Sequence, residues 1–100
     1  MSAIDLTDEQ LTIIKKILRA HLPTKTEVWL FGSRVTGKAK PYSDIDLVIK
    51  AEHPLTLDLL ARLTDNFENS SLPYKVDIVD WYAIDNEFKR IIESQRQKII

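Results

Sequence analysis

The sequence predicts an α/β fold of the α+β kind, in which one small mixed β-sheet carries flanking helices. Two observations lead to this prediction. Segments with apolar residues at helical spacing alternate along the chain with short apolar runs of strand length. The chain has 100 residues, of which 44% are hydrophobic, and this is enough for one apolar core. We therefore expect residues 1–100 to form a single domain.

The first predicted element is a helix over residues 7–22. Thr7 and Gln10 have the spacing of a capping box, and apolar residues then recur every three or four positions until the chain reaches a proline. A short run of β-branched and aromatic residues at 26–31 predicts the first strand, which Gly32 ends. Helix and strand thus follow each other with only a short connection.

The remaining elements show the same two spacings. Residues 33–42 are polar and basic, which predicts a functional connection or a short irregular helix. Beyond them we expect strands at 44–50 and 75–79, a helix at 55–67 between them, and a final helix marked by Ile84, Phe88, Ile91 and Ile92. The ending, residues 98–100, is either a last strand or a frayed tail.

The connections predict the directions of the strands. The strands at 44–50 and 75–79 are joined through a helix, so a right-handed crossover should make them parallel. If the polar residues after 26–31 and those at the start of 44–50 form one site, the first strand must end where the second begins. These two strands are then antiparallel, the sheet is mixed, and the polar residues gather at one end of it.

Three aspartates are the main candidates for a functional site. Alternate side chains of a strand share a face, so Asp44 and Asp46 point to one side while their apolar neighbours point to the other. Asp77 lies between apolar residues of the third strand and should face the same side. Aspartate is disfavoured in strands, so this placement indicates function rather than stability. Hard carboxylate oxygens favour magnesium or manganese over zinc.

A glycine and several basic residues lie close to these acids. Gly32 permits a close approach of the backbone to a phosphate, and Ser33 adds a hydroxyl and an amide donor. Arg34, Lys38 and Lys40 follow in one short connection, where they can neutralise the charge of a triphosphate. For the two lysines a solvated basic loop is an equal alternative, and Ser33 alternatively caps a turn. The pattern therefore predicts acids that hold metal beside bases that hold phosphate.

Together these residues resemble a known signature. Gly32-Ser33-Arg34, Gly37 and Ser43-Asp44-Ile45-Asp46-Leu47 are similar to the GSRxxG...SDxDL pattern of the polymerase-beta-like nucleotidyltransferase superfamily, and within it to the minimal nucleotidyltransferase (MNT) group. The resemblance implies the polymerase-beta palm-like fold and a transfer of AMP from ATP that uses two Mg²⁺ ions. It implies that Asp44, Asp46 and Asp77 are catalytic and hold the metal, and that Asp77 helps to deprotonate the acceptor hydroxyl. The implied nucleotide and phosphate site consists of Gly32, Ser33, Arg34 and Ser43.

The resemblance also implies a partner. MNT proteins of this size act as antitoxins of HEPN proteins, which are helical RNase toxins, by adenylylating a toxin tyrosine, so a hetero-oligomer is expected. One alternative is a non-catalytic antitoxin that neutralises its partner by binding, and another is transfer to a small molecule such as an antibiotic. For Asp77 the alternative is a surface or turn acid. The pair Trp81-Tyr82 belongs either to the core or to a partner surface.

The overall composition excludes several classes of site. The net charge of -1 gives no general attraction to nucleic acid or anionic membranes. The absence of cysteine excludes disulfides, thiolate metal sites and cysteine nucleophiles. No apolar run approaches the roughly 20 residues that span a bilayer, and the first residues do not resemble a signal peptide. We therefore expect a cytoplasmic protein that contacts neither nucleic acid nor membrane.

Overall fold

The computed structural model describes residues 4–100 and contains the predicted succession of helices and strands. Its elements are α1 (Asp8–His21), β1 (Glu27–Phe31), α2 (Ser33–Thr36), β2 (Ile45–Lys50), α3 (Leu57–Glu68), β3 (Val76–Asp80), the 3-10 turn η1 (Trp81–Ala83), α4 (Asn86–Gln95) and β4 (Gln97–Lys98). The ending of the chain is a strand rather than a frayed tail, and the connection at 33–42 contains a short helix.

The longer helices begin at side-chain caps, which satisfy amide groups that have no partner inside a helix. At α1 both hydrogen bonds of the predicted capping box between Thr7 and Gln10 are present. Thr56 caps α3 by accepting the Leu59 N–H at 3.1 Å, so this helix begins at Leu57 and not at residue 55 as predicted. None of the helices within residues 4–100 is long and apolar enough to cross a bilayer.

The sheet has the strand order β3-β2-β1-β4. β1 and β2 are antiparallel while β2 and β3 are parallel, so the mixed sheet that the connections predicted is confirmed. β4 runs antiparallel to β1, and the Ile99 N–H continues this pairing by donating to the Val28 carbonyl at 2.9 Å. The last residues of the chain therefore form one edge of the sheet.

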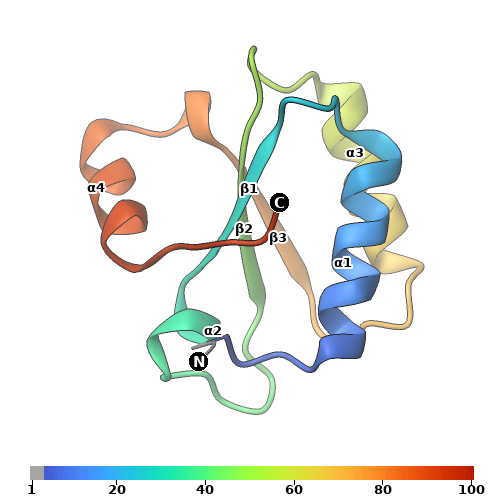
Figure 1. The fold of residues 1–100 in the computed structure, drawn as a ribbon, viewed down its shortest axis with the longest axis vertical. Helices are drawn as coiled ribbons and strands as arrows, with labels where there is room; N and C mark the ends of the chain where they lie inside the picture. The colour runs from blue at the N-terminus through green and yellow to red at the C-terminus, as the bar shows by residue number, and fades with distance from the viewer. Residues whose placement is uncertain (1–3) are drawn as a thin grey trace.

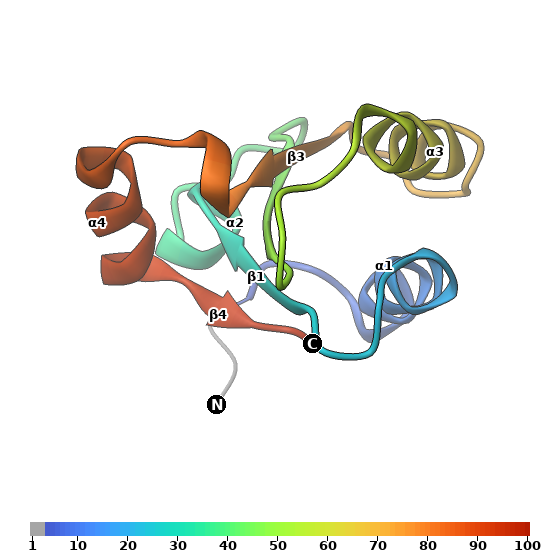
Figure 2. The same cartoon turned by 90° about the horizontal axis from the view of Figure 1, so that it is seen from above.

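Helices cover both faces of the sheet, as Figures 1 and 2 show. α1 and α3 lie on one face, and α4 lies on the other. The larger core is under α1 and α3 and includes Ile14, Leu30, Leu47 and Leu63. The smaller core is under α4 and consists of Trp29, Phe31, Val48 and Ile92, with partly buried residues packed around them. The alternation of side chains along β1 and β2 divides their apolar residues between the two cores.

The two ends of the sheet carry different loops. β1 ends and β2 begins at the end where α2 lies in Figure 1. The loops that lead into β1 and out of β2 lie at the opposite end. Because β1 and β2 are antiparallel, Gly32 and Asp44, which are well separated along the chain, come to the same end of the sheet.

Candidate active site

The three predicted acids gather where β2 begins. Asp46 pairs in register with Phe31 of β1 on one side and with Asp77 of β3 on the other. Because neighbouring strands lie about 4.8 Å apart and paired side chains share a face, Asp46 and Asp77 are direct neighbours. Asp44 is exposed and lies one residue before β2, so the strand begins at Ile45 and not at residue 44 as predicted. The sheet thus brings together acids from two strands and the loop before them.

The electrostatic effects of this grouping are concentrated on Asp46. Burial, followed by the negative charges of Asp77 and Asp44, raises the pKa of the Asp46 carboxyl from 3.8 to about 6. A divalent cation would relieve this repulsion, and carboxylate oxygens are the ligands that magnesium prefers. The chemistry of the three side chains therefore fits the predicted metal.

The three acids do not surround a single point at which a metal ion could bind. Within residues 4–100, no three side chains with carboxylate, imidazole or thiol groups are already placed to bind a metal. Asp77 forms an ion pair with Lys75, with 3.5 Å between its Oδ1 and the lysine Nζ, and both side chains are exposed. Exposed pairs of this kind contribute only about 0–1 kcal/mol. The Asp77 carboxylate can therefore leave Lys75 at small cost.

Gly32 lies directly against the Asp46 carboxylate. Its φ of 82° and ψ of -157° fall in a region that is nearly restricted to glycine. A Cβ atom on this residue would collide with Oδ2 of Asp46. Gly37 also has a positive φ, 78°, but nothing lies within 4 Å of the place where its Cβ would be. Only Gly32 therefore combines a backbone requirement with close contact to an acid of the site.

Gln95, which the sequence patterns did not single out, contacts the same glycine. It is the last residue of α4, and its Oε1 accepts the Gly32 N–H at 2.6 Å. The two residues are 63 positions apart, so no local spacing indicates their contact. One signal was available: Gln95 is polar although it continues the apolar stripe of the final helix.

Ser33 and Arg34 were both predicted to bind phosphate, and the structure places them differently. Ser33 begins α2, where its amide has no partner inside the helix. The Arg34 guanidinium is 4% exposed and donates to the carbonyls of Asp5 at 3.2 Å and Ser43 at 2.8 Å. It also lies over the Tyr74 ring, 3.8 Å from the centroid. A phosphate contact does not fit this buried position, where Arg34 links three segments of the chain.

Ser43 closes the turn that leads into β2. Its Oγ accepts the Lys40 N–H at 2.8 Å, and its own N–H donates to the Lys40 carbonyl at 3.0 Å. Tyr42, at the tip of this turn, is 92% exposed. The Ser43 hydroxyl keeps its own proton for a further acceptor, so its predicted phosphate contact stays a prediction. The turn sets the position of Asp44, the next residue along the chain.

Comparison with known proteins assigns the chain to a family. Residues 11–99 match the model of the nucleotidyltransferase domain. The chain belongs to the nucleotidyltransferase domain family. The probable protein adenylyltransferase MntA of Haemophilus influenzae is 47% identical over 91 residues, which cover 91% of this chain and 79% of that protein. This chain is thus a homologue of MntA, and the predicted enzyme class, a nucleotidyltransferase, is confirmed.

Solved structures contain the same fold. A chain of a toxin-antitoxin complex with AMP-PNP has a TM-score of 0.78 and 27% identity, over 90% of this nucleotidyltransferase and 72% of that chain. A chain of the complex between a tri-AMPylated Shewanella oneidensis HEPN toxin and MNT antitoxin has a TM-score of 0.73 and 24% identity, over 95% and 72% of the two chains. The predicted nucleotidyltransferase fold is therefore confirmed, and a nucleotide is the substrate of this family.

Asp80, the other acid of β3, has a structural function in this nucleotidyltransferase. Its Oδ2 accepts the Leu55 N–H at 2.9 Å, and its Oδ1 accepts the Tyr82 N–H at 3.1 Å. These bonds tie the loop after β2 to the turn after β3, at the end of the sheet away from the predicted acids. Trp81 belongs to the smaller core, where its ring meets Trp29 edge-on with 5.6 Å between centroids.

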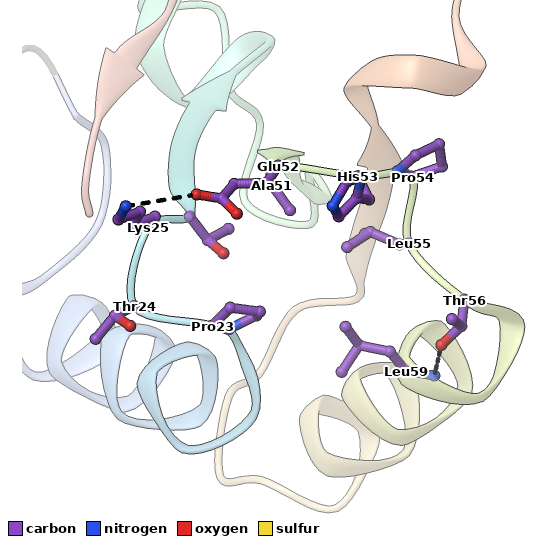
Figure 3. Close-up of a pocket in the computed structure, with 11 residues that line it drawn as sticks. Pro23, Thr24, Lys25, Ala51, Glu52, His53, Pro54, Leu55, Thr56 and Leu59 are labelled. Atoms are coloured by element: carbon purple, nitrogen blue, oxygen red, sulfur yellow. Dashed lines mark hydrogen bonds and ion pairs between the residues drawn. The ribbon is translucent and has the colours of Figure 1, made fainter.

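A cavity of about 380 Å³ also lies at that far end of the nucleotidyltransferase fold. Figure 3 shows that it is lined by the loop before β1, by the loop after β2, and by Leu59 of α3. Lys25 and Glu52 form an ion pair at its edge, 3.9 Å long. None of the residues predicted to bind nucleotide or metal lines this cavity. The candidate active site is therefore the open end of the sheet at Asp46.

Proposed function

We propose that this nucleotidyltransferase transfers AMP from ATP to a tyrosine hydroxyl of a partner HEPN protein and thereby acts as its antitoxin. The observation that carries the proposal is the pairing of Asp46 with Asp77, directly beside Gly32 and Ser33. The similarity to MntA supports a protein as the acceptor. The likeness to chains of toxin-antitoxin complexes, one with AMP-PNP and one with an AMPylated HEPN toxin, supports ATP as the donor and the toxin as the partner.

The residues of the site have separate tasks in this proposal. The turn at Gly32 receives the triphosphate through the amide and the hydroxyl of Ser33. The carboxylates of Asp44, Asp46 and Asp77 hold two Mg²⁺ ions through their oxygens. Bound magnesium supplies positive charge that stabilises the attacking and leaving oxygens of the transfer. A bound cation would also favour the ionised form of Asp46, whose pKa is raised by burial and then by the negative charges of Asp77 and Asp44.

The transfer exchanges one phosphorus–oxygen bond for another. The oxygen of the acceptor hydroxyl attacks the α-phosphorus of ATP, the bond from this phosphorus to the oxygen that bridges to the β-phosphate breaks, and pyrophosphate leaves. The proton of the acceptor hydroxyl passes to the carboxylate of Asp77, which is exposed enough for a second protein to reach. The protein itself forms no covalent bond, so its contribution is to position both reactants.

The test is the transfer of label from ATP that is labelled at its α-phosphate to the HEPN protein that is proposed as the partner. With magnesium, the wild type should label the partner, and Asp44→Asn should reduce the rate about 100-fold or more. Asp58→Asn is the matched control, since Asp58 is an exposed acid of α3 whose ion-pair partner is Arg62. It should label the partner at the wild-type rate.

Two other outcomes would favour the alternatives. A wild-type protein that neutralises its partner in a stable complex without any transfer of label would favour an antitoxin that acts by binding alone. Pyrophosphate release that depends on a small molecule and not on the HEPN protein would favour transfer to that molecule.

A further inference from the structure

The side of α4 that faces the sheet carries one polar residue among apolar ones. Phe88, Ile92 and Gln95 occupy positions i, i+4 and i+7, which share one face of a helix. The Phe88 ring meets Phe31 edge-on with 5.9 Å between centroids, and Ile92 is fully buried. An apolar residue at position 95 would continue this packing. The packing of α4 therefore does not explain why position 95 is a glutamine.

The neighbours of Gln95 fix the position of its backbone at the end of α4. Ile92 is buried one turn before it. Arg96, directly after it, ends the helix by donating its N–H to the Ile92 carbonyl at 2.9 Å. The Arg96 guanidinium also lies over the Trp29 ring, 4.1 Å from the centroid. Because residues on both sides are anchored, the backbone of Gln95 is already ordered where its side chain accepts the Gly32 N–H.

This hydrogen bond acts on the nucleotide site because of what Gly32 touches. At 2.6 Å the bond is short for an N–H donor and an oxygen acceptor. The same glycine lies against the Asp46 carboxylate, and Ser33 follows it in the chain. A fixed Gly32 amide therefore sets both the space beside Asp46 and the direction of the Ser33 amide. It also leaves Ser33, and not Gly32, as the backbone donor that is free for a phosphate.

We propose that Gln95 is a positioning residue of the nucleotide site. Through Gly32 it holds the Gly32-Ser33 turn against Asp46, so that a magnesium-bound nucleoside triphosphate meets the phosphate donors and the acids in one fixed arrangement. Gln95 acts through Gly32 and does not itself touch the nucleotide. This inference rests on the proposed function, because it requires that the triphosphate binds at Ser33 beside the acids.

The substitution Gln95→Met tests the inference, because methionine has a similar length but lacks the amide oxygen. Calorimetry measures the dissociation constant of a non-hydrolysable ATP analogue in the presence of magnesium. We expect the affinity to fall about tenfold, which corresponds to the loss of one hydrogen bond. Hydrogen exchange of the Gly32 amide, followed by NMR, should become faster. Gln95→Ala is measured alongside, because it removes the same acceptor without adding an apolar side chain.

Two controls separate positioning of the nucleotide from a general loosening of α4. Ile92→Val weakens the packing of the helix and leaves the hydrogen bond in place. Gln97→Met makes the same chemical change at an exposed residue of β4. Both should bind the analogue like the wild type, although Ile92→Val should melt at a lower temperature. If Gln95 were only structural, Gln95→Met would also show a lower Tm with unchanged affinity, and that result would overturn the inference.

The remaining outcomes distinguish this inference from the proposed function. If both Gln95 variants bind the analogue as well as the wild type or better, while the wild type labels its partner, only the inference about Gln95 is wrong. If the wild type binds no analogue with magnesium, the proposed function and this inference fail together. Weaker binding by both Gln95 variants, with faster exchange at Gly32 and unchanged binding by both controls, would support it.

Discussion

At the scale of single residues, Gly32 brings the backbone directly against the carboxylate of Asp46. Its backbone conformation excludes most other residues, its Cα faces Asp46, and its N–H is bound by Gln95. From the sequence, a glycine is expected here because it lets the backbone come close to a phosphate. The structure adds a second reason, since a Cβ atom here would collide with the Asp46 carboxylate, a predicted metal ligand.

Substitution of the two glycines should separate these reasons. Gly32→Ala should lose stability by about 1–3 kcal/mol because of its backbone conformation, and should also lose magnesium-nucleotide binding because the new methyl group collides with Asp46. Gly37→Ala should lose about 1–2 kcal/mol and keep binding, since the space around Gly37 is open. Urea unfolding and nucleotide titration measure the two quantities. Equal binding by both variants would contradict the contact with Asp46 as the cause.

At the scale of elements, a buried arginine of α2 fixes the connection from α2 to β2. The buried Arg34 joins the N-terminal segment at Asp5, the turn at Ser43 and the ring of Tyr74. A basic residue in a basic loop suggests phosphate binding when only the sequence is read. Burial changes this interpretation, because a charge removed from water needs partners, and here two backbone carbonyls and the Asp5 carboxylate, 3.8 Å away, supply them.

Arg34→Met should therefore act on stability first. We expect a loss of about 2–4 kcal/mol, because the carbonyls of Asp5 and Ser43 lose a charged donor. The control is Arg62→Met, which removes an exposed ion pair with Asp58 on α3 and should cost less than about 0.5 kcal/mol. Urea denaturation compares both variants with the wild type. A loss of nucleotide affinity in Arg34→Met with unchanged stability would restore the phosphate-binding interpretation.

At the scale of the whole molecule, the two apolar cores support a charged end of the sheet. β1 and β2 contribute side chains to both cores, and the acids lie at the end of the sheet where β2 and β3 begin. The folded protein must therefore bring carboxylates together that are far apart in the unfolded chain. Burial of Asp46, followed by the negative charges of Asp77 and Asp44, raises the pKa of its carboxyl.

The pH dependence of stability follows from that pKa. The Asp46 pKa rises from 3.8 to about 6, so between these values the folded state holds its proton more tightly than the unfolded state. Without divalent cations, the stability that the protonated Asp46 carboxyl gives to the folded state is fully present below about pH 4 and is lost as the pH rises through about 6. Asp46→Asn should therefore gain stability relative to the wild type by about 1 kcal/mol from pH 4 to 7, a value reduced by solvent screening of a half-buried group.

Thermal or urea unfolding of the wild type and Asp46→Asn at several pH values, in the presence of a chelator, measures this difference. Asp58→Asn serves as the control, because its exposed carboxyl lies on α3 and pairs with Arg62. A stability difference between wild type and Asp46→Asn that does not change with pH would contradict the raised pKa of Asp46.

Most of the fold could be predicted because it depends on local spacing. The helical stripes, the short apolar strands and the crossover rule were enough for the element order and for the mixed sheet. The boundaries were less predictable. α3 begins two residues later than expected because Thr56 is its cap, and β2 begins one residue later because the ladder to β3 starts with the Ile45 N–H, which donates to the Lys75 carbonyl at 2.8 Å.

The sequence by itself determined that Asp44 and Asp46 share one face, because alternation along a strand is a local property of the chain, and the crossover rule predicted Asp77 on the same side. Only the tertiary structure decided that Arg34 is buried, that the last residues pair with β1, and that Gln95 reaches Gly32. These three features depend on contacts between segments far apart in the sequence. Such contacts are set by how the helices pack on the sheet, and no local spacing of residues encodes them.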